Sequence, residues 1–144
     1  YSVKGGELGK RKGELVILRV ACHMKAWYEW GSHVERSLGC GLSMAEIERV
    51  KKGGNATGWP VDESLLINSV DELIANHALS KETTSSLHTY FSIQQIMDII
   101  AIHGMYVILG CMVNTFGLEL DQEIEAKLPN SVTKHQFQKE IIRK

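Results

Sequence analysis

The sequence is poor in cysteine. Its three cysteines, Cys22, Cys40 and Cys111, lie far apart and form no C-x-x-C pair. An odd number of widely spaced cysteines argues against a disulfide framework and against a zinc site. We therefore expect each thiol to be a small buried side chain, in a protein of the reducing cytoplasm.

The sequence also lacks a charge excess and an uninterrupted hydrophobic span. Its formal net charge is -1, which gives no electrostatic footprint for nucleic acid or for an anionic membrane. The longest apolar run, Ile99 to Val113, contains His103 and Gly104. It is shorter than the ~20 residues that a membrane-spanning helix needs, so we predict a buried helix and no membrane or nucleic-acid partner.

Hydrophobic side chains recur with helical spacing nearly throughout the 144 residues. The composition, 44% apolar and 23% charged, is typical of one soluble globular domain, residues 1–144. No convincing strand pattern is present, so the predicted fold class is all-α. We expect a mobile glycine-rich lead-in over 4–13 and helices over 14–40, 43–52, 61–77, 81–90 and 92–116. A short amphipathic helix through Phe137 and Ile141 is expected near the C-terminus, where it could pack against a partner subunit.

Two capping boxes mark helix starts. In "SMAE" the Ser43 hydroxyl can accept from the backbone of Glu46 while the Glu46 side chain reaches back, and "SIQQ" places Ser92 and Gln95 in the same relation. Gly117 is expected to end the helix that begins after Ser92.

Residues 14–40 leave one question open. No Gly or Pro interrupts residues 14–30, so local rules alone would draw one long helix. Glu14 and Glu29 would then lie about 22 Å apart, at ~1.5 Å per residue, and could not share a site. A turn between about Cys22 and Trp27 would bring them together, but local sequence does not reveal one.

The segment "GELVILRVACHMKAWYEWGSHVERSLGCGLSMAEIERVKKG" resembles the carboxymuconolactone decarboxylase family, which includes the AhpD-like alkylhydroperoxidases. The resemblance rests on "ELVILRVA" from Glu14, "YEW" followed by His33, and "GLSMAEI" from Gly41. The later segments "SVDELIANHALS" and "VNTFGLEL" extend it to about Asp121. It implies an AhpD-like helical bundle with a turn before Trp27, assembled into trimers or hexamers.

The resemblance also implies which chemistry is missing. The peroxidase branch of this family uses a C-x-x-C pair beside a histidine and an upstream glutamate. The glutamate matches Glu14 and the histidine matches His33, but the two cysteine positions are occupied by Ala26 and Glu29. Peroxide reduction by a dithiol needs an attacking thiolate and a resolving thiol, so this activity is not expected.

Glu29 and His33 are four residues apart, so they share one face of a helix. A carboxylate beside an imidazole favours the protonated ring and fixes its tautomer, as acid–base catalysis requires. We predict His33 as the general acid/base, Glu29 as its partner and Glu14 as a second carboxyl. The alternative is a surface ion pair worth a few tenths of a kcal/mol.

Three further side chains are candidates for binding substrate: His103 and Tyr106 in the long apolar helix, and Tyr28 beside Glu29. For His103 a satisfied core position is an equal alternative, and for Tyr28 a half-buried aromatic is the default. Trp27 and Trp30 are expected in the core. Glu14, Glu29 and His33 could form a two-carboxylate, one-histidine metal site, but no fourth ligand is evident, so no metal or other cofactor is predicted.

The sequence therefore predicts a cytoplasmic homo-oligomer that decarboxylates a small carboxylated lactone or related acid without a cofactor. Two alternatives remain open. The protein could be a catalytically silent helical oligomer, or an alkylhydroperoxidase-like antioxidant protein that has lost its C-x-x-C pair.

Overall fold

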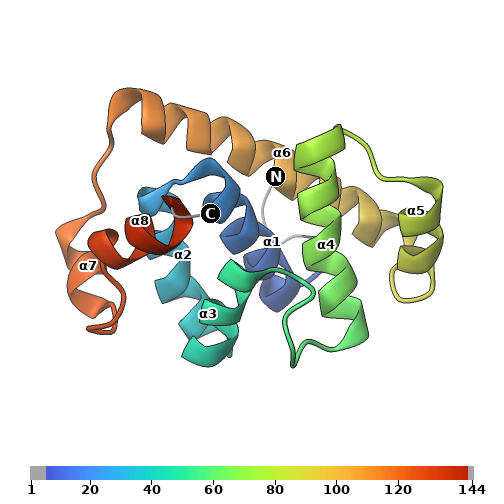
Figure 1. Cartoon of the computed structure of the whole chain (residues 1–144), viewed down its shortest axis with the longest axis horizontal. Coiled ribbons are helices and arrows are strands. Elements are labelled where there is room, and N and C mark those ends of the chain that lie inside the picture. Colours follow the sequence, from blue (N-terminus) through green and yellow to red (C-terminus); the bar gives the residue numbers. More distant parts are fainter. Residues whose placement is uncertain (1–5, 143–144) are drawn as a thin grey trace.

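The computed structural model describes residues 6–142, with side chains to residue 141. This part of the chain forms eight helices and no strand, which confirms the all-α prediction. The elements are α1 (Lys10–Met24), α2 (Trp27–Gly39), α3 (Met44–Lys52), α4 (Val61–Asn76), α5 (Lys81–His88), α6 (Ile93–Phe116), α7 (Gln122–Lys127) and α8 (Lys134–Ile142). Helix α1 lies at the centre, α6 runs along one side, and α5 and the α7–α8 pair lie at opposite ends (Figure 1).

Helix α1 forms the core and packs against α2, α3, α4 and α6. Nearly all of its residues from Gly13 to Cys22 are buried, and Leu15 to Leu18 are fully so. Its first turn is anchored by Arg11, which donates to Glu46 on α3 and to Glu63 on α4. The prediction of a mobile lead-in over 4–13 is therefore wrong from Lys10 onward, because ion pairs hold this turn; Lys4 and Gly5 lie outside the described residues.

The turn after α1 answers the question that the sequence left open. Lys25 takes a left-handed conformation with φ of 53°, and the Lys25 and Ala26 amides donate to the carbonyls of Cys22 and Ala21. This Schellman-type ending reverses the chain, so α1 and α2 pack side by side as two helices. The αL residue is a lysine rather than a glycine, which is why local rules did not reveal the turn.

The predicted caps are confirmed. Both capping boxes, Ser43 with Glu46 and Ser92 with Gln95, form in full, and Gly117 ends α6 in the αL conformation. Helix α5 begins after Ser80, whose hydroxyl accepts from the Thr83 amide. The sequence analysis did not predict α7, a helix of six residues.

The C-terminal helix α8 packs on its own chain. Phe137 is buried and stacks on Trp30 with ring centroids 5.4 Å apart, and its ring is tilted against Trp27 at 6.1 Å. Both tryptophans are buried, as predicted. The amphipathic C-terminal segment therefore covers the start of α2 within the same chain.

Helix α6 differs from its prediction as a buried helix. It is long and apolar enough to cross a membrane by length and composition. Its most apolar 18-residue stretch has a mean hydropathy of 2.0, yet only 33% of that stretch is buried. One face packs on α1 and α4. The other carries exposed apolar side chains: Ile93, Met97, Ile100, Ile108, Met112 and Phe116. Cys111 is also exposed and Cys40 is half-buried, so of the three cysteines only Cys22 has the predicted burial.

Candidate active site

The site begins with a pair that the α1–α2 turn creates. Glu14 projects from α1 and His33 from α2, and Oε2 of Glu14 lies 2.7 Å from Nδ1 of His33. Both residues are buried, with 6% and 3% of their surface exposed. A charge-assisted contact of this length between buried groups fixes the orientation of the imidazole ring. It also assigns the hydrogen of Nδ1 to the bond with Glu14 when that carboxyl is ionised.

The second carboxyl faces the other nitrogen of the same ring. Oε2 of Glu29 lies 3.8 Å from Nε2 of His33, and Glu29 is also buried. This separation is too long for a hydrogen bond. Burial raises the pKa of Glu29, while the positive charges of His33 and Arg36 oppose the rise. A short gap therefore separates Nε2 of His33 from the Glu29 carboxyl. This carboxyl holds its proton more strongly than an exposed glutamate does.

Tyr106 closes the site from α6. Its ring meets the His33 ring edge-on, with centroids 5.1 Å apart and planes at 90°. Burial raises the pKa of Tyr106, and the nearby carboxylates of Glu29 and Glu14 raise it further. The phenol therefore stays protonated at neutral pH and is available as a hydrogen-bond donor.

The structure thus brings together Glu14, Glu29, His33 and Tyr106 and places the other two candidates elsewhere. His103 is influenced by the charges of His23 and His77, and burial lowers its pKa. Its Nδ1 is buried with no hydrogen-bond partner in the described chain. Tyr28 lines a separate cavity near the end of α6. Binding roles for His103 and Tyr28 stay predictions.

The sequence analysis did not single out Ser37 as a site residue. Ser37 lies one helical turn beyond His33 on α2, and its Oγ is buried without a hydrogen-bond partner in the described residues. Its four-residue spacing from His33 was the available signal, but a serine in a helix is common. The half-buried Cys40 thiol donates to the carbonyl of Ser37, 3.4 Å away.

No pair of thiols for peroxide reduction is present in this cluster of described residues. Ala26 and Glu29, which occupy the cysteine positions of the redox pattern, are both buried. Burial raises the pKa of the Cys40 thiol, and Glu14 raises it further, so thiolate formation at Cys40 is disfavoured. Among residues 6–142, no group of three or more His, Cys, Asp or Glu side chains is placed to hold a metal ion.

The helical arrangement is an AhpD-like fold. The chain is similar to a crystal structure of a protein of unknown function from Agrobacterium tumefaciens that has been proposed to be the antioxidant defence protein AhpD, with a TM-score of 0.74. The alignment covers 83% of each chain at 20% sequence identity. Neither a protein-family model nor a curated protein sequence matches this chain. The similarity therefore defines the fold, and the chemistry must be argued from the site.

Proposed function

We propose that the protein is a cofactor-independent enzyme that transfers protons at carbon, and that its reaction is the decarboxylation of a small carboxylated lactone or related acid. The observation that carries this proposal is the setting of His33. One ring nitrogen is held by Glu14 at 2.7 Å, and the other faces the buried carboxyl of Glu29 across 3.8 Å. Such a ring is oriented for general acid–base catalysis.

The roles differ from those predicted for the two glutamates. Glu14 is the positioning partner, because it makes the short contact with Nδ1. Glu29 is the second proton carrier, because burial raises its pKa and it lies beside Nε2. A buried carboxyl of raised pKa gives up its proton less readily than an exposed one, so it can hold a proton beside the ring until the reaction uses it.

The reaction would proceed as follows. The bond between carbon and the leaving carboxylate breaks, CO2 departs, and the electron pair forms an enolate on the neighbouring carbonyl. The Tyr106 hydroxyl would donate a hydrogen bond to that oxygen. His33 would deliver the Nε2 proton to the carbon that lost CO2, and would recover a proton from Glu29 or from water. The net change is one carboxylate and one proton converted to CO2 and a C–H bond.

The test is a turnover screen of the purified protein with small carboxylated lactones and β-keto acids, read as CO2 release. Active wild type and a His33→Ala variant that loses turnover by about 10²–10⁴-fold are expected. His88→Ala, which changes an exposed histidine on α5, is the matched control. A panel with no saturable turnover, or a His33→Ala variant as active as wild type, would refute the proposal.

An antioxidant role is the second function to test, because the structurally similar protein has been proposed to have one. The raised pKa of Cys40 and the residues at positions 26 and 29 argue against it. Thiol alkylation should leave any slow peroxide consumption unchanged. Loss of that consumption on alkylation would instead support thiol chemistry. A sample inactive in both assays would favour a silent helical oligomer.

We also propose that the exposed apolar face of α6 joins copies of this chain into a homo-oligomer, a trimer or a hexamer. The helix carries no Lys or Arg, whereas a helix lying on an anionic membrane surface displays them on its polar face. Ile108→Glu should lower the mass measured by light scattering to that of a monomer, whereas the exposed, distant Val61→Glu should not. We also propose a cytoplasmic location, because the formal net charge of -1 gives no attraction to an anionic membrane surface.

A further inference from the structure

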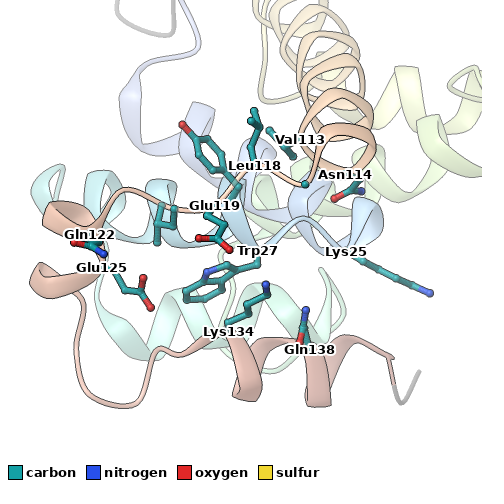
Figure 2. A pocket seen from close by; sticks show the side chains of 13 residues that line it. Lys25, Trp27, Val113, Asn114, Leu118, Glu119, Gln122, Glu125, Lys134 and Gln138 are labelled. Atoms are coloured by element: carbon teal, nitrogen blue, oxygen red, sulfur yellow. The ribbon is translucent and has the colours of Figure 1, made fainter.

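A cavity lies away from the His33 cluster, where α2 begins and α6 ends. Its volume is about 430 Å3, within the ~300–1,000 Å3 typical of small-molecule sites. The turn at Lys25, the first turn of α2, the segment from Gly117 to Leu120, and α7 and α8 all contribute to its wall. Segments that are far apart in the sequence thus converge on one hollow (Figure 2).

The charged side chains around this cavity have no ion-pair partner within residues 6–142. They comprise two cations, Lys25 and Lys134, and two anions, Glu119 and Glu125. All four residues are exposed to solvent. The cavity therefore offers unpaired charges of both signs, which suits a ligand that itself carries both.

An aromatic surface lies between these charges. Trp27 lines the cavity together with Tyr28 and the apolar side chains of Val113 and Leu118. Glu119 and Lys134 lie near the Trp27 ring in this view, whereas Lys25 extends away from it (Figure 2). An aromatic face attracts both an apolar ring and an ammonium group.

We propose that this cavity binds a small zwitterion with an apolar body, of the class of the aromatic α-amino acids. The ligand's ammonium group would lie beside Glu119 and the Trp27 ring, and its carboxylate would accept from Lys134. Its ring would pack against Trp27, Val113 and Leu118. The Asn114 amide, whose Nδ2 donates to the carbonyl of Met24 at 2.7 Å, keeps its side-chain oxygen available to a second ligand donor.

Calorimetric titration of the full chain with L-phenylalanine tests this assignment. Two analogues divide the charges: 3-phenylpropionate lacks the ammonium group and 2-phenylethylamine lacks the carboxylate. Saturable binding of L-phenylalanine is expected, with each analogue at least about tenfold weaker because one charged contact is lost. Tryptophan fluorescence should change on binding, and Trp27→Phe should remove that change.

Matched variants locate the site. Glu119→Gln and Lys134→Met should each weaken L-phenylalanine binding at least about tenfold. Glu123→Gln and Lys127→Met, which change exposed charges on α7 outside the cavity, should bind as wild type does. His33→Ala should also bind as wild type, which separates this proposal from the proposed decarboxylation. No saturable binding up to about 10 mM, an analogue that binds as tightly as L-phenylalanine, or unaltered binding by the Glu119 and Lys134 variants would overturn it.

Discussion

Two histidine–carboxylate pairs connect α1 to its neighbours, and they differ in what surrounds them. Glu14 on α1 contacts His33 on α2 at 2.7 Å, while His23 on α1 contacts Asp71 on α4 at 2.6 Å. The first pair is buried, with side chains 8% and 4% exposed for Glu14 and His33. The second is open to solvent, at 29% and 33% for His23 and Asp71.

The third group in each cluster decides the chemistry. Arg19 donates from Nε to the same oxygen of Asp71 that contacts His23, at 2.7 Å, so a permanent cation already neutralises that carboxylate. In the buried cluster the third group is a second carboxyl, Glu29, and its pKa is raised by burial. The His23–Asp71 pair therefore links α1 to α4, whereas the Glu14–His33 pair and Glu29 hold proton-carrying groups away from water.

The largest expected difference between the clusters is in turnover. Glu14→Gln keeps the size of the side chain but removes the charge that orients His33, so kcat should fall about 10³-fold. Asp71→Asn should change kcat less than about twofold, because the pair at His23 does not face the site. The measurement is steady-state kinetics on a substrate found in the screen. Equal effects of the two substitutions would contradict the distinction.

The next difference is in stability. Glu14→Ala leaves His33 without its buried partner, and the free energy of unfolding should fall by about 3 kcal/mol. Asp71→Ala breaks a partly exposed pair and should cost about 1 kcal/mol. Urea unfolding followed by circular dichroism gives both values. If Asp71→Ala proves the more costly, the surface cluster contributes more to the fold than its exposure indicates.

The clusters should also respond to pH in opposite directions. The folded pKa of Glu29 is raised above 4.5, so its contribution to stability is full below about pH 4.5 and is lost as the pH rises through the folded value. The hydrogen bonds from His23 and Arg19 lower the pKa of Asp71 below 3.8, despite the opposing effect of its burial. Its contribution is present above about pH 3.8 and is lost as the pH falls.

This contrast can be measured by unfolding wild type, Glu29→Gln and Asp71→Asn between about pH 3 and 8. Glu29→Gln should gain stability relative to wild type as the pH rises above about 4.5. Asp71→Asn should lose its disadvantage relative to wild type as the pH falls below about 3.8. If the stability of both variants relative to wild type changes with pH in the same way, the two clusters do not differ in their pH dependence, and the prediction is wrong.

The sequence predicted the local parts of this picture better than the long-range ones. The capping boxes at Ser43 and Ser92 involve residues three apart, and both are present. The spacing of Glu29 and His33 identified a pair that the structure holds at 3.8 Å. The closer partner, Glu14, is 19 positions from His33, and periodicity alone cannot reveal such a contact. Only the family resemblance predicted it.

The sequence also did not predict which face of α6 is exposed. Its apolar run correctly predicted a helix, but a run that is hydrophobic on every side does not reveal which face the rest of the chain covers. The α1 and α4 helices cover one face, and side chains such as Ile108 and Phe116 stay exposed. Likewise, nothing local indicated that Lys25 would take a left-handed conformation.

The smallest predicted effect concerns two non-glycine residues that end helices in a left-handed conformation. Lys25 ends α1 before the turn to His33, and His77 ends α4 near His103; both are non-glycine residues with positive φ, 53° and 61°. Glycine adopts this conformation without the steric cost that a Cβ imposes, so Lys25→Gly should raise the free energy of unfolding by about 0.5 kcal/mol. His77→Gly should gain a similar amount, and it also removes a charge that lowers the pKa of His103.

Urea unfolding of both variants measures the gains, and kcat of Lys25→Gly should equal that of wild type because the turn keeps its geometry. A Lys25→Gly variant that is more stable but less active would mean that the lysine side chain, and not only its backbone, helps to place Glu14 against His33.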